Sequence, residues 1–164
     1  VVANFLEEYY DTGHPTPTTA AVLLGRTIAG LPFGGHMAGR MMRPFRARLE
    51  FENGEVWADR DYTSVLAATI DQIGLGFRPF IRCEERPGTF HILAITCGPF
   101  ELVRELPNIR LGRPISEERS RSRVASSVQF SSDEPITYII DGDMHTSEGP
   151  VTLEAGPRVE IIIK

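Results

Sequence analysis

The stretch FRARLEFENGEVWA, residues 45–58, constrains the fold more than any other part of the chain. Apolar and polar residues alternate on both sides of Asn53 and Gly54, which is typical of two strands that each bury one face. An Asn-Gly pair readily adopts the backbone conformations of a tight turn between antiparallel strands. The sequence therefore predicts a β-hairpin here, and an antiparallel sheet around it.

Most of the later apolar segments are also predicted to form strands. The run SVLAATIDQIGLGF at 64–77 is nearly continuous, which predicts a strand buried on both faces, and FHILAITC at 90–97 is another such run. Three further strands are predicted in VASSVQFSS (124–132), ITYIID (136–141) and PRVEIII (157–163).

Helical patterns gather near the N-terminus. Residues 5–10 predict a short helix, and residues 20–31 predict a second helix capped by Thr18 or Thr19. A short helical piece is predicted at 99–106, followed by a polar, arginine-rich stretch at 107–123. Because helices and strands are segregated along the chain, we expect an α+β fold, mainly β. The expected architecture is an antiparallel two-layer β-sandwich with a few helices near the N-terminus.

Composition narrows the function classes. A chain of 164 residues is long enough for one domain with a real core, and we expect residues 1–164 to form a single domain. The net charge of −5 gives the chain no electrostatic reason to bind nucleic acid. The chain opens on an apolar pattern without an initiator Met, so we expect it to be cut from a longer protein.

The two cysteines, Cys83 and Cys97, lie in apolar segments without metal-binding spacing, so buried free thiols are expected. That expectation agrees with a cytoplasmic protein. The four histidines also lack metal spacing, and His91 is predicted to be packed in a strand. The pair Gly74 and Gly76 favours a bulge or a close backbone approach.

Two arginine-rich stretches leave alternatives open. The tract at 110–123 suits phosphates or an anionic membrane surface, but its interleaved glutamates favour a solvated loop. The stretch RMMRPFRAR at 40–48 suits an amphipathic ligand with a negative head, and it equally suits a surface of snorkelling side chains.

The sequence Asp141-Gly142-Asp143 follows a predicted strand and also has two interpretations. Asp-Gly is a common hairpin turn, and spacing alone favours that interpretation. A carboxylate held at the end of a strand could instead accept a proton from a hydroxyl substrate. Spacing does not decide between these roles for Asp143.

A larger set of segments carries a family resemblance. In chain order these are FLEEYYDTG with AAVLLGRTIAG, YTSVLAATIDQIGLGFRPF (62–80), PGTFHILAI (87–95) and ITYIIDGDMHTSEGPVTLEAGPRVEII (136–162). Together they resemble the C-terminal domain of the diacylglycerol kinase catalytic family, which includes bacterial lipid kinases and sphingosine kinases. The resemblance covers nearly the whole chain.

The resemblance implies a role in phosphoryl transfer from ATP to a lipid hydroxyl. The family's first domain carries a GGDGT nucleotide-binding motif that this chain lacks, so ATP and Mg²⁺ are expected to be held mainly by that missing domain. Asp143 stands where the family's DGE motif has its glutamate, with a reach shorter by about 1.5 Å, and is the implied catalytic residue. The implied substrate-cleft residues are Asp141, Gly142, Gly74, Gly76, Phe77 and Phe80.

No metal site is implied within the chain, because Pro87 occupies the position of an aspartate that holds a structural magnesium in some members. The implied partners are a lipid substrate, the protein's own N-terminal nucleotide-binding domain and a peripheral membrane surface, with no nucleic acid. Three alternatives remain: a non-catalytic lipid-binding or regulatory module of the same fold, a NAD kinase-like enzyme, and a purely structural sandwich. The sequence does not identify the lipid.

Overall fold

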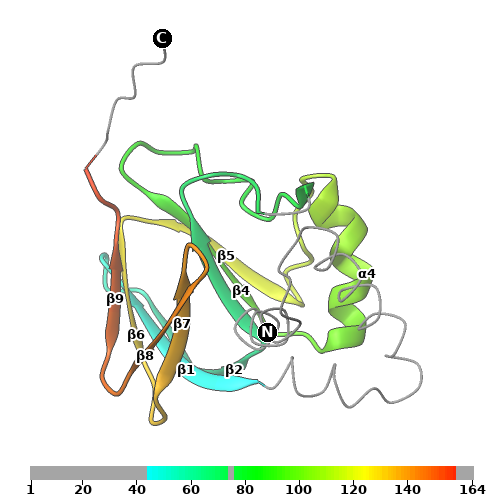
Figure 1. Ribbon diagram of the computed structural model, residues 1–164. Helices are drawn as coiled ribbons and strands as arrows, with labels where there is room; N and C mark the ends of the chain where they lie inside the picture. Colours follow the sequence, from blue (N-terminus) through cyan, green and yellow to red (C-terminus); the bar gives the residue numbers. More distant parts are fainter. Residues whose placement is uncertain (1–43, 74–75, 158–164) are drawn as a thin grey trace.

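The computed structural model describes residues 44–73 and 76–157 of the chain (Figure 1). The helices predicted near the N-terminus, the stretch at 40–43, Gly74 and most of the predicted strand at 157–163 lie outside the described residues. The described strands are β1 (Phe45–Phe51), β2 (Val56–Tyr62), β3 (Ser64–Ala68), β4 (Phe90–Ile95), β5 (Ser120–Ala125), β6 (Ser127–Ser131), β7 (Ile136–Ile140), β8 (Asp143–Ser147) and β9 (Val151–Glu154), and the described helix is α4 (Pro99–Arg110).

The predicted hairpin at 45–58 is confirmed. Strands β1 and β2 pair antiparallel, and the turn between them is closed by a hydrogen bond from the Gly54 N–H to the Phe51 carbonyl at 2.9 Å. Gly54 has φ +79°, a conformation that costs glycine little, and the Phe51 N–H donates to the Glu55 carbonyl. The turn is thus a three-residue loop with a glycine bulge rather than the two-residue turn typical of Asn-Gly.

The strands form three sheets, and every pairing is antiparallel. Their strand orders are β2-β1-β6-β9, β3-β4-β5 and β7-β8. Two single-residue corners carry the chain from one sheet to another, Thr63 between β2 and β3 and Ser126 between β5 and β6. Thr63 is buried and fixes its corner through an N–H bond to the Ile95 carbonyl at 2.8 Å and a hydroxyl bond to the Cys97 carbonyl at 2.6 Å.

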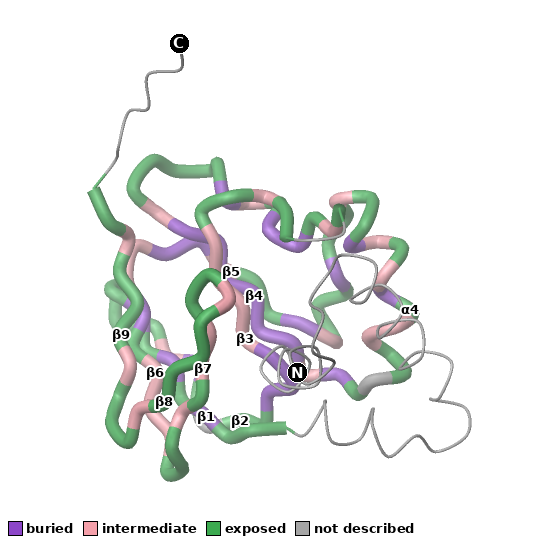
Figure 2. Tube along the Cα trace, viewed as in Figure 1, coloured by how far each residue is buried: buried purple, intermediate pink, exposed green. Residues whose placement is uncertain are grey.

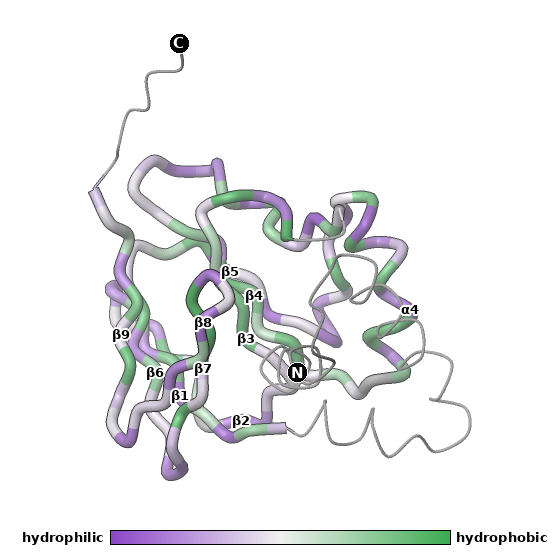
Figure 3. The backbone as a smooth tube through the Cα atoms, viewed as in Figure 1, coloured by the Kyte–Doolittle hydropathy of each residue, from purple (hydrophilic) through white to green (hydrophobic). Residues whose placement is uncertain are grey.

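Strand β4 lies between two hydrophobic cores, and Figure 2 shows it buried along its length. Since side chains alternate across a strand, Ile92 and its alternate neighbours face the four-stranded sheet, where they pack with Leu49, Trp57 and Tyr62. Leu93 on the other face belongs to a second core. Helix α4 and the connection between β3 and β4 both contribute to this second core. Its other buried members are Phe80, Cys83, Ile95, Cys97, Ile109 and Ile115. Figure 3 shows hydrophobic residues along β3 and β4.

The long strand predicted at 64–77 is wrong beyond Ala68, where β3 ends. The next residues form a connection whose apolar side chains Ile70 and Ile73 are 64% and 46% exposed. An isolated bridge pairs Ile73 with Phe77, and the Arg78 N–H donates to the Ile109 carbonyl at 3.0 Å. The chain therefore leaves the sheet after Ala68 and reaches the end of α4. The continuous apolar run in the sequence did not predict this departure.

Helix α4 confirms the helix predicted at 99–106 and extends it to Arg110. It begins with Pro99 at its first position, and the Glu101 carboxylate accepts the Gly98 N–H at 3.1 Å. Pro107 lies inside the helix, where it lacks an N–H but still accepts a bond from the Leu111 N–H at 3.1 Å. The proline thus weakens the last turn without ending it.

The solvated loop predicted for the arginine tract at 110–123 is wrong for its last part, which forms strand β5. The Arg123 guanidinium lies 4.6 Å from the centre of the Phe51 ring and pairs with Glu55, and that of Arg121 lies 5.9 Å from the centre of the Trp57 ring. These two side chains cover aromatic rings at the margin of the first core. They therefore act as packing groups as well as charges.

β5 is an edge strand of its sheet, and side chains donate hydrogen bonds to the carbonyl groups on its outer side. The Thr96 N–H, at the end of β4, bonds the Arg119 carbonyl, so the carbonyls of Ser122 and Val124 point away from β4 by strand alternation. Arg82 donates to the Ser122 carbonyl at 3.4 Å, and Arg86 donates to the Val124 carbonyl at 3.2 Å. Both arginines come from the connection before β4.

Taken together, the described residues form a mainly β, α+β fold of packed antiparallel sheets with one helix, as the sequence predicts. The predicted strands at 90–97 and 136–141 are confirmed as β4 and β7. The single strand predicted at 124–132 is instead the end of β5 and all of β6, separated by the corner at Ser126. Strand β9 was not predicted, and β8 was indicated only by the predicted hairpin turn at Asp141 and Gly142. Within the described residues, no helix is long and apolar enough to cross a membrane.

Candidate functional site

The segment Asp141-Gly142-Asp143 forms the tip of the β7–β8 hairpin. Ile140 pairs with Asp143 across the strands, which leaves Asp141 and Gly142 as a two-residue turn. Both have positive φ, +50° and +103°, as a type I′ turn requires. The predicted turn role of Asp141 and Gly142 is therefore confirmed.

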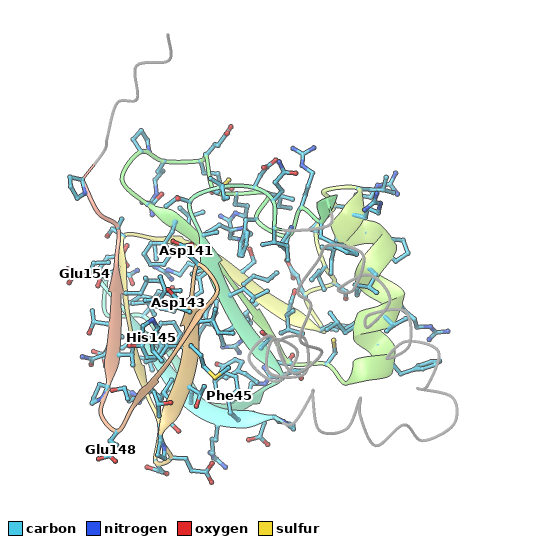
Figure 4. The ribbon with its side chains drawn as sticks, in the orientation of Figure 1. Phe45, Asp141, Asp143, His145, Glu148 and Glu154 are labelled. Carbon is cyan, nitrogen blue, oxygen red and sulfur yellow. The ribbon has the colours of Figure 1, made fainter. Side chains whose placement is uncertain are left out.

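Asp143 is the first residue of β8, and its side chain is exposed. Its backbone is fixed by the pairing with Ile140 while its carboxylate is open to an approaching molecule. Figure 4 shows Asp141, Asp143 and His145 following one another from the turn along β8. Such a carboxylate can accept a hydrogen bond or a proton from a hydroxyl group that reaches the tip.

His145 lies two residues beyond Asp143 and is also exposed. Its ring stacks on that of Tyr138, the residue directly opposite on β7, with ring centres 5.4 Å apart and planes at 25°. The sequence analysis did not select either residue. The polar sequence of β8 gave no strand signal, but once β8 is assigned, its two-residue period places His145 on the same face as Asp143.

The other predicted cleft residues lie in the connection between β3 and β4. Gly76 has φ +75°, and a Cβ at this position would lie 3.3 Å from Arg110 Nη1. This fits the predicted close approach, because a side chain here would be strained and crowded. Phe77 is half-buried, and the Arg110 guanidinium lies 5.9 Å from its ring centre.

Phe80 does not contribute to an exposed apolar surface. Its side chain is 2% exposed and belongs to the second core, with its ring edge-on to His91 at 5.9 Å between centres. Phe80, which the resemblance implies as a substrate-cleft residue, therefore lies inside the fold. Phe80 instead fixes the connection against β4.

A shallow cavity of about 260 Å³ opens between this connection and the end of α4. Asp71 and Arg78 form an ion pair at its wall, with the Arg78 Nε donating to the Asp71 carboxylate at 2.8 Å. The complete lining is Asp71, Arg78, Ile81, Cys83, Glu84, Leu111 and Gly112. Because its charged groups largely pair with one another, the cavity presents no set of convergent free polar groups.

The two cysteines and His91 are packing residues, as predicted. Cys83 and Cys97 are buried and free, and burial raises the pKa of both thiols. His91 is 1% exposed, and burial together with the nearby Arg82 guanidinium lowers its pKa to about 4. Its Nε2 lies 2.7 Å from the Ser122 hydroxyl.

The described residues give no fit for a metal. Glu85, in the stretch ERPG, is engaged by Arg82, whose Nε and Nη2 donate to its carboxylate, and these bonds lower the pKa of Glu85. Within the part of the chain that the structure describes, no group of three His, Cys, Asp or Glu side chains is placed to hold a metal ion. We therefore assign no metal ion to these residues.

The described residues define a mainly β, α+β class of fold, in which three antiparallel sheets pack together and a helix packs against one of them. No protein-family model and no curated protein matches the sequence. The solved structures that the fold matches include two of proposed diacylglycerol kinases from Bacillus anthracis str. Sterne. The first has a TM-score of 0.53 and 17% identity over 69% of this chain. The second has a TM-score of 0.52 and 16% identity over 73% of this chain.

The matches cover 39% and 42% of those two structures, so the chain spans about two fifths of their length. At such low identity the likeness shows the fold alone. The fold of this chain is thus that of one part of these kinase structures, in agreement with the resemblance seen in the sequence.

Proposed function

We propose that this chain is the lipid-side domain of an ATP-dependent lipid kinase, which phosphorylates a hydroxyl of a diacylglycerol-like or sphingoid lipid. The observation that carries the proposal is the fold match to part of two proposed diacylglycerol kinases. The ordered sequence motifs, which resemble those of the diacylglycerol kinase catalytic family, also support it. ATP and Mg²⁺ belong to a preceding nucleotide-binding domain in this proposal.

Asp143 is the catalytic residue of the proposal. It accepts the proton of the lipid hydroxyl, which raises the nucleophilicity of the oxygen, and its exposed position at the hairpin tip supports that role. The pairing of Ile140 with Asp143 supports it further, because a base must be held in a defined place. Gly76 contributes a close backbone approach beside Phe77, and Asp141 and Gly142 form the turn that presents Asp143.

The test is transfer of labelled γ-phosphate from ATP to a total lipid extract by the full-length protein. We expect a labelled lipid, and we expect Asp143→Asn to lower the rate by about 10²- to 10⁴-fold, the usual contribution of general-base catalysis. Glu148→Gln is the matched control, because Glu148 is an exposed carboxylate just beyond the opposite end of β8 and should not affect the rate.

Three results would contradict the proposal in different ways. An Asp143→Asn variant as active as the wild type would remove the base assignment. A well-folded protein that binds lipid but forms no labelled product would indicate a non-catalytic lipid-binding module. Phosphorylation of NAD in place of lipid would indicate a NAD kinase-like enzyme.

A further inference from the structure

One face of the β7–β8 hairpin consists of two chemically different columns. The cross-strand pairs on this face are Ile140 with Asp143, Tyr138 with His145, and Ile136 with Ser147. Residues directly opposite in an antiparallel pair share a face, and so do residues two apart on a strand. The face therefore carries polar groups along β8 and apolar or aromatic groups along β7.

This face is most open at the end that carries the proposed catalytic residue. Ile140 is 55% exposed, and Asp143 and His145 are exposed, whereas Tyr138, Ile136 and Ser147 are half-buried. An exposed apolar side chain next to a carboxylate offers an amphipathic ligand an apolar and a polar contact side by side. The stack of His145 on Tyr138 holds the imidazole plane while leaving its ring nitrogens at the edge.

The spacing of the columns fits a single lipid molecule. Neighbouring strands lie about 4.8 Å apart, which is close to the width of one hydrocarbon chain, and residues two apart on β8 are about 7 Å apart. A lipid hydroxyl at Asp143 thus places the next polar atoms of the same headgroup within reach of His145. Its hydrocarbon then continues along β7.

We propose that this face is the lipid-recognition surface of the domain. His145 hydrogen-bonds a polar headgroup atom beside the reacting hydroxyl, and Ile140 and Tyr138 contact the first methylenes of the chain. The ligand is an amphipathic alcohol with a polar group next to its hydroxyl. The inference rests on the proposed function for the role of Asp143, and it adds the residues that select the substrate.

The experiment titrates the protein with detergent micelles that contain or lack dioctanoylglycerol, followed by calorimetry. We expect His145→Ala and Ile140→Ala each to weaken the dioctanoylglycerol-dependent binding by about three- to tenfold, the effect of one hydrogen bond or one partly buried side chain. His145→Phe keeps an aromatic ring beside Tyr138 but removes the ring nitrogens, so it should bind as weakly as His145→Ala.

Controls come from the opposite face of the same hairpin. Thr146 and Met144 are the neighbours of His145 in β8 and are exposed, but their side chains point away from this face. Thr146→Ala and Met144→Ala should change binding by less than about twofold, with thermal unfolding confirming that all variants fold. Equal losses on both faces, or no dioctanoylglycerol-dependent binding by the folded wild type, would overturn the inference.

Parallel transfer assays with the full-length protein separate this inference from the proposed function. If only the variants on the proposed face lose binding and the protein has no kinase activity, the recognition surface is supported and the kinase proposal is refuted. Conversely, the protein could phosphorylate lipid in an Asp143-dependent way while His145→Ala and Ile140→Ala leave the KM for the lipid unchanged. That result would support the kinase proposal and refute the recognition surface.

Discussion

Lowering the pH from 8 to 5 is expected to destabilise the fold by about 2 kcal/mol through the buried imidazole of His91. Burial and the Arg82 guanidinium lower its pKa from 6.5 to about 4. The backbone N–H of Arg82 donates to Nδ1 of His91 at 3.5 Å, so Nδ1 is the unprotonated nitrogen and Nε2 donates to the Ser122 hydroxyl. A proton added at Nδ1 would face the backbone N–H of Arg82, and the two donors would repel each other.

The sign and the magnitude follow from these two pKa values. The unfolded chain binds a proton at His91 below pH 6.5 and the folded chain does not, so stability is complete above that pH and is lost as the pH falls toward 4. At 1.36 kcal/mol per pH unit, the loss accumulated by pH 5 is about 2 kcal/mol and its limit at lower pH is about 3 kcal/mol. The pKa values of Glu52, Glu85 and Glu105 are lowered from 4.5, so their own losses begin below this window.

The assay is urea unfolding followed by the fluorescence of Trp57 at several pH values between 8 and 5. His91→Gln should be less stable than the wild type at pH 8, because it loses packing against Phe80, but its stability should depend less on pH. His145→Gln is the exposed-histidine control and should keep the wild-type pH dependence. The reasoning would be refuted if the free energy of unfolding of the wild type stayed within about 0.5 kcal/mol across this pH range. It would also be refuted if His91→Gln lost as much stability at low pH as the wild type does.

Two further predictions test the packing of the cores. Ile92→Ala should lower the free energy of unfolding by about 2–5 kcal/mol in denaturant titrations, because Ile92 is fully buried between the sheets. Ile70→Ala, at an exposed site, should change it by less than about 0.5 kcal/mol. Equal effects of the two substitutions would contradict the described core. Cys97 should react with a thiol reagent only at the rate of unfolding, because it is buried and burial raises its pKa. Rapid labelling of Cys97 in the folded protein would show that its site is open.

The features that the sequence predicted correctly depend on local chemistry. The β1–β2 hairpin follows from alternation around Asn53 and Gly54, and the β7–β8 turn follows from the tolerance of Asp141 and Gly142 for positive φ. Strand β4 follows from an apolar run that two cores cover. In each case neighbours in sequence determine the conformation, so no distant contact had to be known.

The features that it missed depend on contacts between distant segments. The chain after Ala68 leaves the sheet toward the end of α4, where the Arg78 N–H donates to the Ile109 carbonyl. Arg121 and Arg123 lie in strand β5, where their guanidinium groups contact aromatic rings of the β1–β2 hairpin. Strand β8 has four exposed residues in succession, so it has no hydrophobic period to detect. The position of Asp143 was accessible from the sequence, but the placement of His145 on the same face required the strand pairing.

The two guanidinium groups on the outer carbonyls of β5 have a consequence for the behaviour of the protein in a crowded solution. An open strand edge is a template on which the strand of another molecule can add, and repeated addition leads to aggregation. Arg82 and Arg86 occupy the acceptors that such an incoming strand would use, and they bring positive charge to the same edge. The protein thus keeps this margin of its sheet from recruiting copies of itself.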